Sequence, residues 1–251
     1  KTVLSRSILR LVPEPPGIRA GGSVLLDGRD LQALDESALR SVRGREIAMV
    51  FQDPMTSLNP VMTIGRQIAE TLEEHLGTRG AAARVRATGL LRAVGIPSPD
   101  LRIDEYPQQL SGAMRQRASI AMALACQPRI LIADEPTTAL DVTIQMQILV
   151  LLKRLQRETG MAMIFISHDL GAVASVADEI AVMYAGRIVE QAPTADLFRQ
   201  VRMPYTEALL HARPRLDAPP HQRLRALDGR PPDLAQPIRA NLFRSDDEYG
   251  V

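Results

Sequence analysis

Cysteine is almost absent from this sequence, which has one in 251 residues, Cys126. A single cysteine can form no disulfide within the chain, so a disulfide framework is excluded and a reducing compartment fits. Cys126 directly follows the apolar stretch Ala121 to Ala125. We therefore interpret it as an inert side chain of the core.

An excess of either charge is also lacking, because 30 Lys and Arg residues face 29 Asp and Glu residues, for a net charge of +1. No broad cationic field is then available to hold a phosphate backbone. The composition therefore does not favour a nucleic-acid partner.

Long apolar runs are missing as well. None approaches the roughly 18 residues needed to span a bilayer, and residues 1–6 do not resemble a signal peptide. The 45% apolar content can bury one sizeable core, or a core with a smaller lobe. We expect a globular chain whose role at a membrane, if it has one, is peripheral.

The first half of the sequence predicts a helix over 3–12, followed by a hairpin over 23–31. The hairpin turns at Asp27-Gly28 and predicts a small antiparallel unit. A strand is predicted over 46–51. Residues 62–126 are mostly helical in pattern, with breaks at prolines, and we interpret them as a helical insertion.

From residue 129 onward, strands alternate with helices. The pattern predicts strands over 130–133, 161–166 and 179–184, with helices over 142–158 and 170–176. This alternation is typical of a parallel sheet covered by helices, and it indicates the α/β class.

An apolar strand ends abruptly in two carboxylates, Asp134 and Glu135. One carboxylate at a sheet edge suits Mg²⁺, which prefers one or two carboxylates together with phosphate oxygens, and we expect Asp134 to take that role. Because side chains alternate along a strand, Glu135 should point elsewhere, where it could take a proton from an attacking water. Taken alone, the pair could also be solvated acids that follow a strand.

Two short segments suggest phosphate binding. Lys1-Thr2 matches the last two positions of the loop G-x-x-x-x-G-K-[ST], in which Lys meets phosphates and the hydroxyl ligates Mg²⁺. Ser111-Gly112 opens a predicted helix that runs to about Ala125, and a helix start favours an anion. Each segment also has an ordinary interpretation when it is taken alone. Lys1 could be a solvated lysine at an arbitrary chain end, and Ser111 could simply cap a helix.

Five segments together resemble the motifs of ABC ATPases. They are 110–117 (the signature sequence), 130–135 (the Walker B strand), 137–141 (the D-loop), 50–54 (the Q-loop, with Gln52) and 166–169 (the switch histidine, His168). The chain is identified on this basis as a member of that family. The resemblance implies a RecA-like P-loop ATPase core, with a small antiparallel β unit and the helical insertion.

The resemblance also implies the roles of individual residues. ATP is bound in a head-to-tail pair of subunits, each ATP between one chain's phosphate-binding face and the other chain's signature helix. Lys1, Thr2, Gln52 and Asp134 would bind ATP, and Thr2, Gln52 and Asp134 would hold Mg²⁺. Glu135 and His168 would be catalytic, whereas Ser111, Gly112, Ala113 and Asp141 would serve the partner's nucleotide.

The subfamily is indicated by the segments 51–60, 134–143, 183–190, 204–210 and 229–234, which resemble the oligopeptide/dipeptide/nickel importer ATPases. That resemblance implies a second ATPase subunit, two transmembrane permeases and, indirectly, a solute-binding protein. It places the subunit at the cytoplasmic face of a bacterial inner membrane, with import of oligopeptides, dipeptides or related small solutes as its task.

The sequence departs from the family pattern in three places. The N-terminal strands and most of the phosphate loop do not precede Lys1, so we expect residues 1–200 to be an incomplete ABC ATPase domain that is inactive in this form. Ala113 stands where the signature usually has a second glycine. Residues 201–251, a Pro- and Arg-rich extension, have no cysteine, and we expect no metal cluster there.

Two alternatives remain open. A catalytically weakened partner subunit would bind ATP without turning it over, and Ala113 favours it, whereas Glu135 and His168 do not. An ABC ATPase acting on DNA would usually insert coiled coils or zinc modules, and the sequence has neither a long heptad run nor cysteine pairs.

Overall fold

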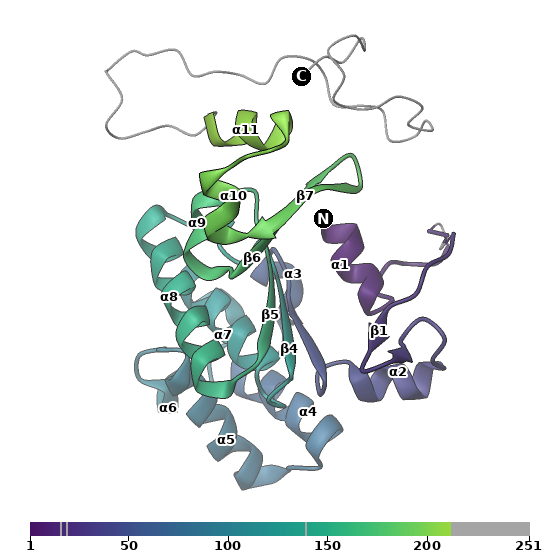
Figure 1. Ribbon diagram of the computed structural model, residues 1–251. Coiled ribbons are helices and arrows are strands. Elements are labelled where there is room, and N and C mark those ends of the chain that lie inside the picture. The colour runs from purple at the N-terminus through teal and green to yellow at the C-terminus, as the bar shows by residue number, and fades with distance from the viewer. Residues whose placement is uncertain (16, 19, 139, 212–251) are drawn as a thin grey trace. The chain divides into compact units, whose positions relative to one another are not determined.

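The computed structural model describes residues 1–211 except Pro16, Arg19 and Ala139 (Figure 1). The chain divides into two compact units, Lys1–His168 and Asp169–Val251, which are described separately below. None of the described helices is long and apolar enough to cross a membrane.

The first unit contains eight α-helices, one 3₁₀-helix and five strands among its described residues. In chain order they are α1 (Thr2–Ile8), β1 (Leu25–Leu26), β2 (Arg29–Asp30), α2 (Glu36–Val42), β3 (Ile47–Val50), α3 (Pro54–Ser57), α4 (Ile64–Leu76), α5 (Gly80–Ala93), α6 (Pro99–Arg102), η1 (Pro107–Gln109), α7 (Gly112–Ala123), β4 (Ile130–Asp134), α8 (Val142–Thr159) and β5 (Ala162–Ile166).

The centre of this unit is a parallel sheet with the strand order β3-β4-β5. The register pairs Ile47 with Ile130, and Ile130 with Ala162, so the three strands run in step. Parallel strands in step end at the same edge, which brings together the residues that follow them. The predicted parallel sheet is confirmed for β4 and β5, and β3, predicted only as a strand, pairs with β4 in the same sheet.

The sheet separates two apolar cores because successive side chains of a strand face opposite ways. Leu131 packs in the larger cluster with the helices α4, α5, α7 and α8, whereas Ile132 packs in a smaller cluster with Leu9 and Leu31. Both β4 side chains are fully buried. Cys126 lies in the larger cluster as predicted, and burial raises the pKa of its thiol.

The segment 62–126 is helical, as the sequence predicts, with α4, α5, α6, η1 and α7 in succession. Thr63 caps α4 by accepting a hydrogen bond from Arg66 N, and the helix ends at Gly77, whose φ is 66°. Pro99 and Pro107 each occupy a first helical position, where proline's missing N–H is not needed. Prolines therefore begin the short helices here.

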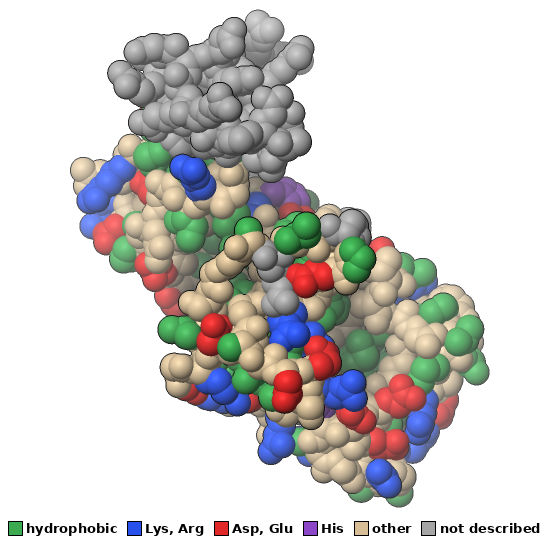
Figure 2. Space-filling view, turned by 90° about the vertical axis from the view of Figure 1, so that its right-hand side faces the viewer, with side chains coloured by type: hydrophobic (Ala, Val, Ile, Leu, Met, Phe, Trp, Pro, Cys, Tyr) green, Lys and Arg blue, Asp and Glu red, His purple; other side chains and the backbone are tan. Residues whose placement is uncertain are grey.

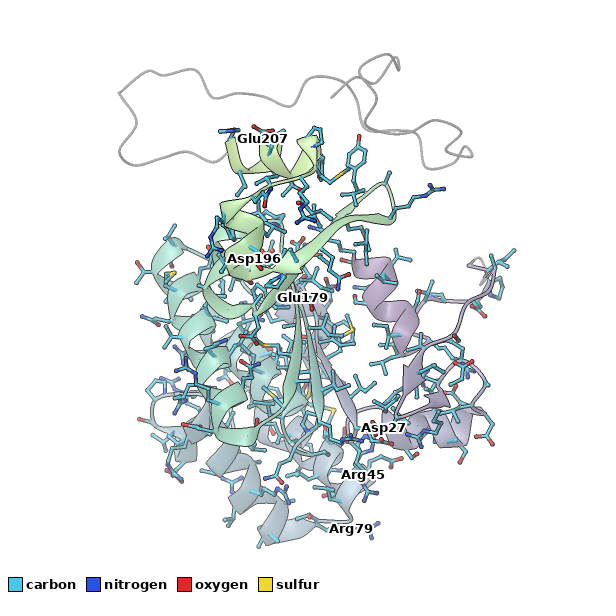
Figure 3. The ribbon with its side chains drawn as sticks, in the orientation of Figure 1. Asp27, Arg45, Arg79, Glu179, Asp196 and Glu207 are labelled. Carbon is cyan, nitrogen blue, oxygen red and sulfur yellow. The ribbon has the colours of Figure 1, made fainter. Side chains whose placement is uncertain are left out.

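The predicted hairpin is confirmed as the pair β1 and β2, whose turn residues Asp27 and Gly28 have φ of 50° and 79°. Two positive φ values are typical of a two-residue hairpin turn. Asp27, labelled in Figure 3, pairs with Arg129 before β4 at 2.6 Å, and this contact lowers the pKa of the Asp27 carboxyl. The exposed pair links the hairpin to the sheet but contributes little stability.

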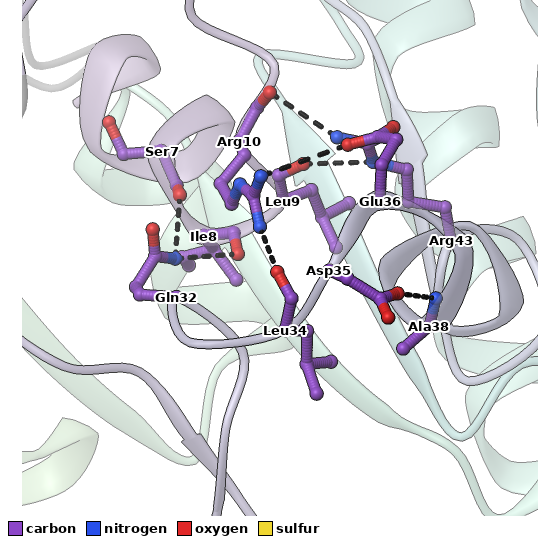
Figure 4. A network of polar contacts seen from close by, with 10 residues as sticks. All are labelled: Ser7, Ile8, Leu9, Arg10, Gln32, Leu34, Asp35, Glu36, Ala38 and Arg43. Carbon is purple, nitrogen blue, oxygen red and sulfur yellow. Dashed lines mark hydrogen bonds and ion pairs between the residues drawn. The ribbon is translucent and has the colours of Figure 1, made fainter.

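Helix α1 is shorter than the predicted 3–12, because it ends at Ile8 and Arg10 has a φ of 54°. The carbonyls at its C-terminal end accept hydrogen bonds from side chains of later segments (Figure 4). Gln32 Nε2 donates to the carbonyls of Ser7 and Ile8, and Arg43 Nε donates to that of Leu9 at 2.9 Å. Partners distant in sequence therefore set the end of α1.

The second unit contains α9 (Leu170–Val176), β6 (Glu179–Tyr184), β7 (Arg187–Pro193), α10 (Thr194–Arg199) and α11 (Pro204–His211). The strand predicted over 179–184 is present, but it does not belong to the parallel sheet. It pairs with β7 in an antiparallel hairpin. The cause is the two-residue turn Ala185-Gly186, whose φ values of 48° and 80° reverse the chain at once.

Residues 201–251 were expected to form a Pro- and Arg-rich extension, and the structure shows one helix, α11, in the part of this segment that it describes. The tail segment 229–234 and the expected absence of a metal cluster concern residues outside the described part. On the face drawn in Figure 2, acidic and basic side chains are interspersed, in agreement with the balanced charge of the sequence.

Candidate active site

Asp134 is the last residue of β4 and is fully buried. Its Oδ1 accepts a hydrogen bond from Thr2 Oγ1 over 3.2 Å, whereas its Oδ2 is buried without a hydrogen-bond partner. A buried carboxylate oxygen without a partner is costly unless something binds it. Carboxylate and hydroxyl oxygens side by side are the donor set that Mg²⁺ prefers, so these residues fit that ion.

Glu135 follows the strand and leaves it with a φ of 47°. The expected reason for its direction is therefore wrong. Strand alternation does not extend to Glu135, because the backbone leaves the strand at this residue, and the two carboxylates have different partners. Its side chain is 17% exposed, so it is accessible from the sheet edge but mostly enclosed.

The carboxylate of Glu135 is the meeting point of three loops. Gln52, which follows β3, donates from Nε2 to Glu135 Oε2 over 3.2 Å, and His168 Nδ1, after β5, lies 3.2 Å from the same oxygen. The structure thus brings together three residues that the sequence motifs selected separately. The parallel register explains this, since all three follow strands that end at one edge.

Lys1 lies near this cluster. Its Nζ donates to the carbonyl of Ser167 over 2.7 Å, next to His168. Lys1 is the N-cap of α1 and Thr2 its first residue, so one helix start brings the ammonium group to the end of β5 and the hydroxyl to the end of β4.

The residues expected to serve the partner's nucleotide lie at other helix starts. Ser111 caps α7 by accepting a hydrogen bond from Met114 N, and Asp141 caps α8 by accepting one from Ile144 N. Gly112 is exposed, and a Cβ placed on it would meet nothing within 4 Å; Ala113 is half-buried. The contacts described for Ser111 and Asp141 are local ones, which the ordinary capping interpretation also predicts.

One residue of the cluster was not selected from the sequence. Thr138 Oγ1 donates to Glu135 Oε2 over 2.8 Å. The segment 137–141 was read only as a family motif, and no spacing rule distinguishes Thr138 from Thr137. The available signal for Thr138 was its position, since a hydroxyl three residues after a candidate base can reach that base across a turn.

Comparisons with known proteins agree with this geometry. A family model described as "ABC transporter" matches residues 1–138, and one described as "Oligopeptide/dipeptide transporter, C-terminal region" matches residues 189–244. The chain belongs to the ABC transporter family. It is an ATPase of the kind that powers transport, and the resemblance of its motifs to those of ABC ATPases is confirmed.

Its relatives include the oligopeptide transport ATP-binding protein OppD of Bacillus subtilis, which is 51% identical over 251 residues, covering 100% of this chain and 70% of the relative. A putative peptide import ATP-binding protein of Brucella melitensis is 54% identical over 245 residues, covering 94% of this chain and 72% of that protein.

Solved structures of ABC ATPases share the fold. The ATP-binding cassette MJ0796, as a dimer in a post-hydrolysis state with ADP and Pi, matches with a TM-score of 0.65 and 28% identity, over 77% of this chain and 79% of that one. CbiO1 from Clostridium perfringens, part of the transporter complex cbiONQ, matches with a TM-score of 0.66 and 25% identity, over 79% and 74% of the two chains.

Proposed function

We propose that this ABC ATPase drives the import of oligopeptides, dipeptides or related small solutes. The observation that carries the proposal is the cluster at the sheet edge, where Gln52 and His168 both contact Oε2 of Glu135. The peptide class is supported by the match of residues 189–244 to the oligopeptide/dipeptide transporter C-terminal region and by the names of the relatives.

In this proposal Thr2, Gln52 and Asp134 hold Mg²⁺, and the buried unpartnered Oδ2 of Asp134 is the strongest support. The ion, when bound, would neutralise charge on the phosphate oxygens of ATP. Lys1 contacts the phosphates with its ammonium group. Together with Gln52 and Asp134, Lys1 and Thr2 form the part of the site that binds ATP.

The catalytic residues are Glu135 and His168. Glu135 accepts a proton from the water that attacks the γ-phosphate, while His168 orients that phosphate by a hydrogen bond. His168 is suited to meet a ligand because its side chain is 67% exposed at the end of β5.

The other half of each nucleotide site would come from a second ATPase subunit. Ser111, Gly112, Ala113 and Asp141 would contact the partner's nucleotide, and the exposed Gly112 lets a phosphate approach the backbone. Further partners would be two transmembrane permeases and, through them, a solute-binding protein. The subunit would then lie at the cytoplasmic face of a bacterial inner membrane.

We further propose that residues 1–200 form the ATPase domain and that 201–251 form the C-terminal extension typical of peptide importers. The match of residues 189–244 to the C-terminal-region family supports an extension of this type in the last part of the chain.

Reconstitution of the importer in proteoliposomes tests the proposed function. With the permeases, the second ATPase subunit and the binding protein present, uptake of a radiolabelled oligopeptide should require ATP and Mg²⁺ and should stop with a non-hydrolysable ATP analogue. Hydrolysis without uptake of any di- or oligopeptide would exclude the peptide class while leaving the ATPase assignment intact.

Ala113 favours a second candidate function, that of a weakened partner subunit. Ala113 lies in the first turn of α7, where alanine costs no strain and favours the helix over glycine by roughly 1 kcal/mol. We therefore expect Ala113→Gly to raise ATPase activity of the assembled importer only a fewfold. An increase of a hundredfold or more, measured by phosphate release, would show that the site served by Ala113 is nearly inactive in the natural protein.

A further inference from the structure

Glu135 has a third contact besides those with Gln52 and His168. Thr138 Oγ1 lies 2.8 Å from Glu135 Oε2, against 3.2 Å for each of the other two contacts. Hydrogen bonds to a carboxylate are shorter and stronger than bonds between neutral groups. The closest donor to this oxygen is therefore a residue outside the catalytic set described above.

The backbone fixes Thr138 relative to Glu135. Thr138 N donates to Glu135 O over 3.1 Å, which closes a turn, and Glu135 N donates to Ile166 O over 2.9 Å, which ties that turn to β5. Thr137 is only 6% exposed, and Leu140 packs against the larger core. The threonine hydroxyl and the carboxylate are thus carried by one anchored segment.

Gln52 and His168, in contrast, lie on separate loops that follow β3 and β5. In the proposed function both turn toward the γ-phosphate and its metal ion when ATP is bound. Gln52 then holds the metal ion through its amide oxygen and His168 orients its ring toward the phosphate, so both side chains have the nucleotide as a second ligand besides Glu135. The donor that stays with the carboxylate is Thr138.

We propose that Thr138 is a positioning residue for hydrolysis, and this inference rests on the proposed role of Glu135 as the base. The water oxygen forms a bond to the γ-phosphorus, the bond from that phosphorus to the oxygen of the leaving ADP breaks, and the water proton passes to Glu135. Thr138 takes no proton in this step. Its hydroxyl holds the carboxylate in the orientation from which it accepts one.

The test compares Thr138→Val, which removes the hydroxyl but keeps the branched shape, with Thr138→Ser, which keeps the hydroxyl. In the assembled importer, Thr138→Val should lower kcat tenfold to a hundredfold, the usual effect of a misplaced catalytic group. The KM for ATP should stay within twofold, and Thr138→Ser should restore most of the rate. Thr78→Val, a matched change in the loop after α4, should leave kcat unchanged.

The outcomes separate this inference from the function on which it rests. If Glu135→Gln is inactive while Thr138→Val turns over ATP at the natural rate, the positioning role is excluded and the base remains. If Glu135→Gln itself is active, the proposed base is wrong. In the Glu135→Gln background Thr138→Val should lower the residual rate no further, and an additional tenfold loss would show that Thr138 acts independently of Glu135.

Discussion

Replacing Glu135 with glutamine is expected to remove most ATP turnover in the assembled importer while leaving ATP binding intact. The amide has nearly the size of the carboxylate, but it cannot take the proton of the attacking water. Loss of a general base commonly costs 10²–10⁴-fold in rate. Hydrolysis is then too slow to separate the subunits, so ATP-bound dimers should accumulate.

Two measurements check this expectation. Phosphate release gives the rate, and size-exclusion chromatography with ATP and Mg²⁺ should show a doubled mass for the isolated ATPase subunit. Glu74→Gln is the matched control, because Glu74 is an exposed glutamate of α4, and it should behave as the natural protein does. Normal turnover in Glu135→Gln would remove Glu135 from the catalytic role.

The largest effect on stability is expected at Gly65, in the first turn of α4. Its N–H donates to Ile103 O over 2.8 Å, and a Cβ on Gly65 would lie 2.7 Å from that oxygen and 2.3 Å from Ile103 Cγ1. Both contacts are too short, and the first is with backbone that cannot rotate away. Gly65→Ala should therefore lower the free energy of unfolding by about 1–3 kcal/mol, despite the better helix propensity of alanine.

Gly89, within α5, provides the matched control. A Cβ there would meet nothing within 4 Å, so Gly89→Ala should raise the free energy of unfolding by roughly 0.5–1 kcal/mol through helix propensity alone. Urea unfolding followed by circular dichroism should move the two midpoints in opposite directions. A Gly65→Ala protein as stable as the natural one would show that α4 and Ile103 can separate without cost.

The sequence predicts the site well where the chemistry depends on strand ends. Asp134, Gln52 and His168 each lie at or just after a parallel strand, so a correct strand assignment places all three at one edge. The same logic failed for β6, because strand propensity does not say which partner a strand takes. There the two-residue turn Ala185-Gly186 decided the pairing.

Contacts between side chains and carbonyls distant in the sequence could not be predicted from the sequence. The end of α1 depends on Gln32 and Arg43, more than twenty residues away, and no local signal marks those two residues as its partners. Thr138 is a different case, because its contact with Glu135 spans three residues but depends on a turn whose geometry only the structure supplies.

The left-handed backbone at Glu135 has a consequence for engineering this protein. The left-handed conformation costs most residues roughly 1–2 kcal/mol of folding free energy; glycine avoids this cost, and asparagine and aspartate tolerate the conformation better than other residues. Glutamate at φ 47° is therefore not the residue that folding stability alone would select. A variant library screened only for expression or heat resistance should therefore enrich glycine or asparagine at position 135. Thermostabilisation of this ATPase has to select on phosphate release as well, or its most stable products will be the ones that no longer hydrolyse ATP.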